Sequence, residues 1–410
     1  MTVRPEVPSP TGYGALLRVS GFPGLVASQF LGRIAGQMLR VGLVLFVLSR
    51  YNSPQLAGAA TFLLLLPGLL VAPVAGALLD RHGRTRLITV DYLVAAAALF
   101  AIAGLSARHL LAPPTLLLIC GAASLTGPLS WAGLRSMFPS VVPGHLWERA
   151  NALDTSSDVL SAVVGAPLGG LLVGFAGGEW ELAAAATLFV CAGLAALRVR
   201  DPSVKERTNR VLAQAWSGLL YVLRNRSLIG LAATFIAFGV GWGCLSIAMP
   251  VLVLGRLHQG PAVVGYIWGA VGAAGFVSIL FFGGLKTARR EKQLMAGSLV
   301  AMAIAMSLLP RAASVWVVAA ALIAAAVVEA PFDIAFLTLR QRRTDAASFG
   351  RMFAISMALN QLGQPVGSAL AGPLIAWSLT GALWFAATLV ALAALLALVV
   401  IPAEGKASDG

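Results

Sequence analysis

Basic and amide side chains recur inside the first long apolar segment of the chain. Gln29, Arg33, Gln37 and Arg40 lie four, four and three residues apart, so a helix would place all of them along one face. A charge at the centre of a membrane helix costs about 2.5 to 3.5 kcal/mol on insertion scales, and it is tolerated where it faces protein or water. Such an arginine can pair with an acid or bind an anionic group of a ligand through charge-assisted hydrogen bonds.

Acidic side chains lie inside two other apolar segments. Asp154 and Asp158 are four residues apart in the fifth segment, and Glu329 and Asp333 have the same spacing around Pro331 in the tenth. A carboxyl group in such a place can take up and release a proton, because burial and nearby charges both change its affinity for protons. Asp158, Glu329 and Asp333 are therefore candidates for substrate binding and for coupling.

These charges can meet only if their helices bring them to one depth. With a helical rise of about 1.5 Å per residue, counted from each predicted cytoplasmic end, Arg33 and Glu329 lie about 15 Å deep and Asp158 about 12 Å deep. We hypothesise that Arg33 pairs with an acid from the fifth or the tenth helix, and that protonation or substrate binding breaks the pair. A permanent structural ion pair is the alternative. We expect these charges to line a substrate cavity, and we assign Gln37, Arg40 and Asp333 to it as well.

Membrane-spanning helices must hold these residues. The chain has 410 residues, of which 59% are hydrophobic and only 11% are charged, and its mean hydropathy is +0.87. A helix needs about 20 apolar residues to cross a bilayer core of about 30 Å. We predict twelve such helices, over residues 23–49, 55–79, 87–106, 115–135, 150–175, 182–197, 228–254, 262–285, 294–309, 314–339, 353–377 and 383–401.

The positive charges are distributed as a membrane topology requires. With a cytoplasmic N-terminus, the odd-numbered turns hold only Arg50, Arg108, Arg256 and Arg311 of the 29 Lys and Arg residues, and the tails and even-numbered turns hold most of the others. This positive-inside pattern places both termini in the cytoplasm. It also explains the net charge of +13 without a nucleic-acid partner. We predict a multi-pass protein of the cell inner (cytoplasmic) membrane.

A polar segment near the middle divides the chain into two related halves. We expect a cytoplasmic tail over residues 1–20, a six-helix bundle over 21–199, a cytoplasmic linker with an amphipathic helix over 200–226, a second bundle over 227–402 and a tail over 403–410. A shift of 198 residues brings four positions of the first half onto identical residues of the second: Gly165, Pro167, Gly169 and Gly174 onto Gly363, Pro365, Gly367 and Gly372. Repeated bundles with a site between them are typical of alternating access.

The turn after the second helix carries the most specific motif. Its spacing of Gly, three residues, Asp-Arg, one residue and Gly-Arg resembles the loop signature of major facilitator superfamily transporters. The resemblance implies an all-α membrane fold of twelve helices in two pseudo-symmetric bundles. It also implies a cytoplasmic gate that locks the halves together in the outward-open state, formed by Gly76, Asp80, Arg81, Gly83 and Arg84. Thr85 departs from the basic residue usual there, and Asp91 is expected to be a local partner for Arg84 and Arg86. Loop charges that only fix topology are the structural alternative.

The fifth helix resembles a second signature, found in the drug exporters of this family. Its residues 165–170 contain Gly165, Pro167, Gly169 and Gly170, with one alanine inserted between the first glycine and the proline. Pro139 and residues 349–351 also resemble landmarks of the macrolide and siderophore exporter branch. The resemblance implies export of an amphiphilic drug or natural product, coupled to the proton gradient and needing no other cofactor. A helix-packing face is the alternative for the glycines.

One departure from the exporters leaves the substrate open. They often carry an acid in the middle of the first helix, where this chain has Gln37 between two arginines. Neutral, zwitterionic and anionic substrates therefore stay possible, and Arg40 can meet them directly. A lysophospholipid or siderophore carrier stays open beside the drug exporter, as does uptake beside export. A scaffold or sensor that does not transport is the alternative of another class.

The sequence favours neither an enzyme nor a metal protein. It lacks the phosphate-binding loop that ends in Gly-Lys-Ser/Thr, which argues against ATP hydrolysis. Cys120, Cys191 and Cys244 lie singly in apolar segments, and the four histidines fall in turns. We expect a monomer in the lipid bilayer, with a small amphiphilic organic substrate, no metal and no nucleic acid.

Overall fold

The computed structural model describes residues 13–199, 201, 220, 223–284, 290–343 and 359–402. Across these residues the regular structure is helical, and eleven helices are long and apolar enough to cross a membrane. The predicted amphipathic helix of the linker lies almost entirely outside the described residues, and positions 1–12, 349–351 and 403–410 lie outside them completely.

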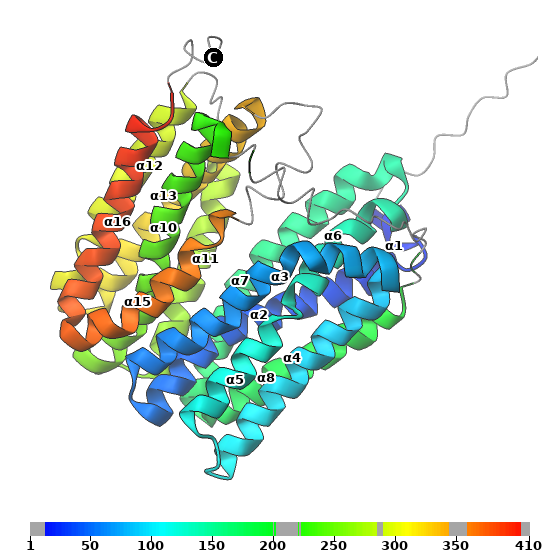
Figure 1. Ribbon diagram of the computed structural model, residues 1–410, viewed down its shortest axis with the longest axis horizontal. Helices are drawn as coiled ribbons and strands as arrows, with labels where there is room; N and C mark the ends of the chain where they lie inside the picture. The colour runs from blue at the N-terminus through cyan, green and yellow to red at the C-terminus, as the bar shows by residue number, and fades with distance from the viewer. Residues whose placement is uncertain are drawn as a thin grey trace, which may run out of the picture.

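The first half contains a short helix and seven longer helices, which run through the blue, cyan and green parts of Figure 1. The predicted fourth span is two helices, because Pro128 has no N–H to continue the ladder across Leu125 and Thr126. The bounds are α1 Tyr13–Leu17, α2 Phe22–Tyr51, α3 Pro54–His82, α4 Arg84–Ala107, α5 Pro113–Ser124, α6 Gly127–Val141, α7 Trp147–Ala176 and α8 Gly178–Leu197.

The second half begins after the linker. Its first span ends in a short π-helical turn, Leu252–Arg256, and its fifth span is described from residue 359, with α15 beginning at Gly363. The bounds are α10 Arg226–Val251, α11 Pro261–Phe282, α12 Glu291–Met306, α13 Val315–Arg343, α15 Gly363–Trp377 and α16 Leu379–Val399.

Local sequence sets where several of these helices begin and end. Ser53 caps α3 by accepting a hydrogen bond from the Leu56 N–H, and Pro54 follows it at the first helical position. Asn225 caps α10 in the same way, through the N–H groups of Ser227 and Leu228. Gly83 separates α3 from α4 with a φ of 91°, a conformation that favours glycine. The gate motif therefore lies on a sharp turn.

The two halves meet at one end and diverge at the other. Figure 1 shows two groups of helices that approach each other at the bottom of the view and separate toward the C-terminus and α1. Among the described residues, the most extensive contacts between the halves are those of α7 with α11 and of α3 with α15. Smaller contacts join α10 to α2 and α3, and α11 to α2. The turn between α3 and α4 lies at the diverging end, whereas the starts of α3 and α11 lie at the closed end.

Small residues allow the close approach at the closed end. A Cβ on Gly170 would lie 2.5 Å from the Cα of Gly265, and a Cβ on Gly58 would overlap the carbonyl oxygen of Ser368. Contacts this close need glycine, because a side chain has no room between the backbones. We call the first contact, α7 with α11, the glycine seam.

Candidate functional site

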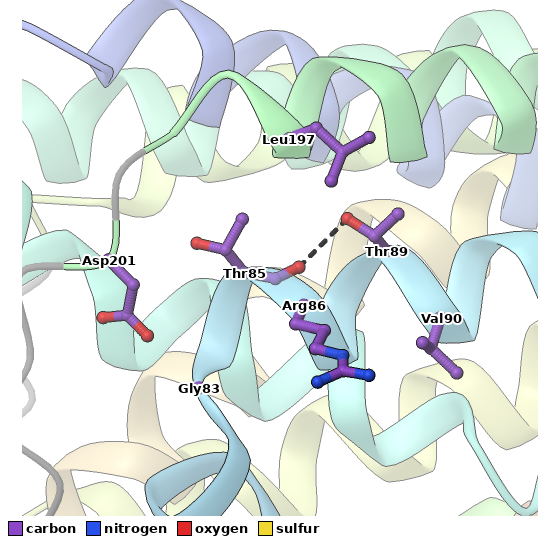
Figure 2. Close-up of a pocket in the computed structure, with 7 residues that line it drawn as sticks. All are labelled: Gly83, Thr85, Arg86, Thr89, Val90, Leu197 and Asp201. Atoms are coloured by element: carbon purple, nitrogen blue, oxygen red, sulfur yellow. Dashed lines mark hydrogen bonds between the residues drawn. The ribbon is translucent and has the colours of Figure 1, made fainter.

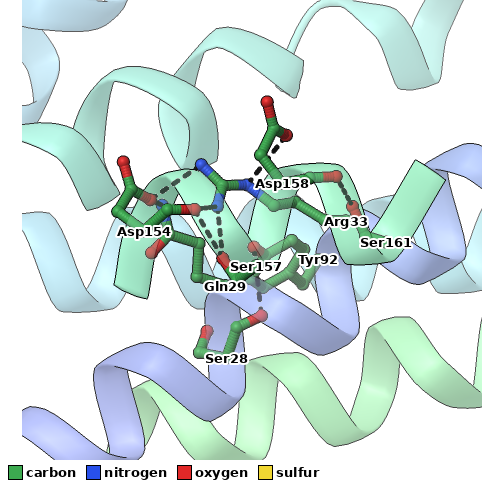
Figure 3. A network of polar contacts seen from close by, with 8 residues as sticks. All are labelled: Ser28, Gln29, Arg33, Tyr92, Asp154, Ser157, Asp158 and Ser161. Carbon is green, nitrogen blue, oxygen red and sulfur yellow. Dashed lines mark hydrogen bonds and ion pairs between the residues drawn. The ribbon is translucent and has the colours of Figure 1, made fainter. Parts of the chain in front are cut away.

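Arg33 is the centre of a polar network between α2 and α7, drawn in Figure 3. Its guanidinium lies 2.8 Å from the Asp154 carboxylate and 3.3 Å from the Asp158 carboxylate. It also donates hydrogen bonds to the Asp154 carbonyl oxygen at 2.7 Å and to the Ser157 hydroxyl. Gln29 donates to the other side of the network, at 2.6 Å from Asp154. Of the two partner helices considered for Arg33, the structure brings the fifth span to it.

The two acids of this network differ in their surroundings. The Asp154 side chain is 20% exposed and is held by Arg33 and Gln29, whereas the Asp158 side chain is 60% exposed. Asp158 has one longer contact with Arg33 and lies within electrostatic range of Arg40. Asp154 is therefore the fixed member of the pair, and Asp158 is the one that solvent or a ligand can reach.

The polar stripe continues along α2 beyond Arg33. Gln37 is half-buried beside α7, where a Cβ on Gly165 would lie 2.7 Å from its Cβ. Arg40 is exposed, and within the described residues it makes no hydrogen bond or ion pair. Gly36, one turn before Arg40, has open space around the position of a Cβ. The face of α2 that carries Arg40 thus borders open space in the middle of the helix.

The second half carries different side chains at the corresponding depth. Glu329 and Asp333 are half-buried on the side of α13 that also carries Phe332 and Phe336. In the parts of the chain that the structure describes, neither acid forms an ion pair. The structure therefore does not bring Arg33 to the tenth span, and the two acids are close to each other instead.

Aromatic side chains pack where α10 meets α13 and α11. The rings of α10 and α13 pack closely, with centroids 4.8 Å apart for Phe235 and Phe336 and 5.2 Å apart for Phe238 and Phe332. Trp242 continues this aromatic cluster to Trp268 on α11, at 6.0 Å. Both tryptophans are half-buried. The wall of the second half is aromatic and acidic, while that of the first half is polar and carries both arginines.

The residues of the fifth-helix motif make close contacts on two sides of α7. A Cβ on Gly169 would lie 2.8 Å from the Met38 carbonyl oxygen of α2, within the first half. Pro167 and Gly170 face α11 instead, beside Gly269 and Gly265. The motif is a packing surface in this structure, and half of it forms the glycine seam between the bundles.

The gate motif makes its contacts inside the first half. Arg84 pairs with Asp80 at 3.2 Å and donates to the Ser136 carbonyl oxygen at 2.9 Å. Arg81 is exposed, and Gly76 has open space around the position of a Cβ. Among the described residues no ion pair joins Asp80 to the second half, which lies apart at this end.

Thr85 and Asp201 tie the gate turn to the end of α8. The Thr85 hydroxyl donates to the Val199 carbonyl oxygen at 3.1 Å, and Asp201 accepts the Arg84 N–H at 2.7 Å, at the start of α4. Figure 2 shows these residues around a surface hollow of about 340 Å³. A lysine or arginine in place of Thr85 would lose this hydrogen bond, so the departure from the family signature has a structural reason.

Two buried acids were misjudged or missed from the sequence. Asp91 does not pair with Arg84 or Arg86. It is buried and interacts with the hydroxyls of Thr126 and Ser130 at the break between α5 and α6. There its carboxylate accepts hydrogen bonds at the start of α6, where the first N–H groups have no partner within the helix.

Glu181 was not singled out because it precedes the predicted sixth span. It is completely buried against α2, where a Cβ on Gly42 would overlap its carboxylate. Within the described part of the chain, neither of its oxygens has a hydrogen-bond partner. Its place directly before the apolar run of the sixth span is the one feature of the sequence that could have drawn attention to it.

Known proteins share both the sequence pattern and the fold. The family model of the Major Facilitator Superfamily matches residues 25–291 and 231–410. An MFS-type transporter of Sinorhizobium fredii, y4rN, is 36% identical over 404 residues, which cover 95% of this chain and 97% of that protein. The multidrug efflux pump Tap of Mycobacterium tuberculosis is 26% identical over 369 residues, which cover 85% and 84%. The solved structure of the nucleoside transporter NupG superposes with a TM-score of 0.73 at 12% identity, over 92% of this chain and 97% of that one.

These likenesses agree with the gate signature and with the apolar helices. The all-α membrane fold predicted from hydropathy is confirmed, and the relatives are transporters rather than enzymes. The chain belongs to the major facilitator superfamily and is a multi-pass membrane transporter.

Proposed function

We propose that this transporter exports an amphiphilic organic molecule across the cell inner membrane by proton-coupled alternating access. The observation that carries the proposal is the Arg33 network, an ion-pair cluster in the middle of α2 with one acid exposed and one fixed. A charge at this depth is tolerated only against protein or water. The network lies between α2 and α7, and both of these helices also contact the second half.

The placement of charge supports the orientation of the proposed cycle in the membrane. The positive-inside pattern assigns the diverging end to the cytoplasm, so the structure corresponds to an inward-facing state. Substrate would enter from the cytoplasm between the halves. The gate around Asp80 would then meet the second half while the glycine seam opens outward. The likeness to Tap, an efflux pump, supports export.

Proton coupling uses the difference between the two acids. Protonation of Asp158 would remove the partner of one edge of the Arg33 guanidinium while Asp154 keeps the other. Such a change alters the contacts between α2 and α7, the helix that forms the seam with the second half. Glu329 and Asp333 are the rival sites for the proton, because they too lie within a span.

A transport assay tests the proposal. Purified protein in vesicles, with an imposed pH gradient and a panel of antibiotics, siderophores and lysophospholipids, should move at least one compound against its gradient. Asp158→Asn, Glu329→Gln and Arg33→Ala should then separate the sites. Normal proton-driven transport in all three variants would remove the coupling mechanism, and no transport of any compound would favour the scaffold alternative.

A further inference from the structure

Arg40 is placed to bind a ligand. It is exposed in the middle of a 30-residue helix, on the face where Gly36 meets open space. A Cβ on Gly42 would meet Glu181 of α8 and one on Gly32 would meet Tyr92 of α4, so those faces of α2 are covered by its own half. The helix also contacts α10 and α11 of the second half. The face of Arg40, which it shares with Arg33, therefore borders the second half beside the exposed Asp158.

The acids near Arg40 leave its charge available. Asp154 is engaged by Arg33 and Gln29, and Asp158 contacts Arg33 at 3.3 Å. Arg40 is close enough to Asp158 to interact electrostatically, but the two are not within ion-pair distance. Its guanidinium presents a fork of donors that matches a carboxylate or a phosphate.

The depth of Arg40 places it opposite the two tryptophans. One helix, α7, sets both depths, because Gly169 touches Met38 of α2 on one side and Pro167 touches Gly269 of α11 on the other. Arg40 follows Met38 by two residues and Trp268 precedes Gly269 by one, so both lie slightly nearer the closed end than these contact points. A ligand that reaches Arg40 from the diverging end therefore passes the half-buried rings of Trp242 and Trp268.

We propose that Arg40 binds an oxyanion of the transported molecule, so that the substrate is an acidic or zwitterionic amphiphile whose apolar part lies against Trp242 and Trp268. This assignment deepens the proposed function and depends on it, because it takes the bound molecule to be the one that is transported. A simple lipophilic cation has no partner at Arg40, since like charges repel. Glu329 and Asp333 can accept the ammonium group of a zwitterion on the opposite wall.

Direct binding to the purified, detergent-solubilised protein tests the assignment. The probes share one apolar group: 2-naphthylacetate, 2-naphthyl phosphate, 2-naphthylalanine and 2-(2-naphthyl)ethylamine. We expect at least one acid and the zwitterion to bind at least tenfold more tightly than the amine. Arg40→Gln should abolish this preference, and Arg40→Lys should retain part of it. Arg108→Gln, the same change on an exposed turn, should leave it unaltered.

The outcomes separate this assignment from the coupling mechanism. Equal binding of acid and amine, or no binding of any acid, overturns it. An Arg40→Gln variant that loses transport but keeps its thermal unfolding temperature and its preference for acids over the amine also overturns it. Arg40 would then be a gate residue. Acids that bind through Arg40 without any pH-driven transport would sink the coupling proposal alone. The carboxylate and phosphate probes distinguish the two sources of the oxyanion.

Discussion

The two halves of this transporter share a fold but distribute their charges differently. In the first half the acids of α7 are bound to Arg33, and the wall they form is polar. In the second half Glu329 and Asp333 lie on α13, whose Phe332 and Phe336 pack against α10, and in the described chain neither acid has an ion pair. Four glycine and proline positions recur in both halves, whereas the charged side chains differ. The first half therefore contributes basic groups, and the second half contributes acids that have no ion pair among the described residues.

The largest effect should come from breaking the ion pair of the first half. Removing one partner of a buried pair leaves the other charge uncompensated and costs about 3 to 5 kcal/mol. We expect Arg33→Ala to lower the free energy of unfolding by about 3 kcal/mol, because Gln29 still holds Asp154. Thermal unfolding in detergent measures this loss.

The second half supplies the control for that measurement. Glu329→Gln removes no ion pair among the described residues and should change the free energy of unfolding by less than about 1 kcal/mol. The double variant Arg33→Ala/Asp154→Ala should recover part of the loss. Equal destabilisation by Arg33→Ala and Glu329→Gln would contradict the contrast between the halves.

The glycine seam offers a test of how the halves separate. A Cβ on Gly265 would lie 2.8 Å from the Cα of Gly170 and 3.1 Å from the Pro167 carbonyl oxygen. Overpacking of this kind costs about 1 to 3 kcal/mol. The cost falls only on states with the seam closed, so Gly265→Val should shift the population toward states with the seam open.

Distances between spin labels placed on α7 and α11 would report that shift. Gly275→Val is the matched control, since Gly275 lies on the same helix with open space around its Cβ position. An unchanged distance distribution in Gly265→Val would show that the seam does not control opening.

The helices were predictable because hydropathy determines which segments enter a membrane. All twelve predicted runs contain a described helix, and the turn singled out for its resemblance to the family signature joins α3 to α4. The break at Pro128 was not predicted, since the run over 115–135 stays apolar on both sides of it. That break explains the wrong expectation for Asp91, whose carboxylate serves the start of α6.

The partner of Arg33 was not predictable to a single helix. Depth along the helices allowed both Asp158 and Glu329, because rise per residue says nothing about how each helix is rotated about its axis. Rotation is set by packing, here by Gly165 and Gly169 against α2. The buried Glu181 was missed for the same reason, because only the packed structure reveals which side of α8 faces Gly42.

Two further ion pairs test the contrast between the halves, one with an exposed acid and one with a buried acid. Asp80 of the first half is 41% exposed in its pair with Arg84, whereas Glu291 of the second half is 2% exposed and lies 2.9 Å from Arg342. Exposed pairs contribute about 0 to 1 kcal/mol, and hydrogen bonds to charged groups about 1.5 to 3 kcal/mol. We expect Glu291→Gln to lower the free energy of unfolding by about 1.5 kcal/mol.

Asp80→Asn should leave stability nearly unchanged and reduce transport instead, by about tenfold if the lost gate contact is worth about 1.4 kcal/mol. Thermal unfolding and vesicle transport of the same two variants measure both quantities. A stable Asp80→Asn variant with full transport would argue that the turn only fixes topology.

The smallest effect should come from Glu181, which departs from the pattern of its own half. It is a buried acid of the first half whose oxygens have no hydrogen-bond partner within the described chain. Burying a polar group without a partner is costly, and an apolar group of similar shape avoids that cost. We expect Glu181→Met to raise the free energy of unfolding by about 1 kcal/mol. Glu179→Met, two residues earlier, should give no gain, because Glu179 accepts a hydrogen bond from Ser106 at 2.7 Å. If Glu181→Met instead stops transport while the protein unfolds at its usual temperature, the acid is functional, and the first half would also hold an unpaired acid of the kind found beside the aromatic cluster.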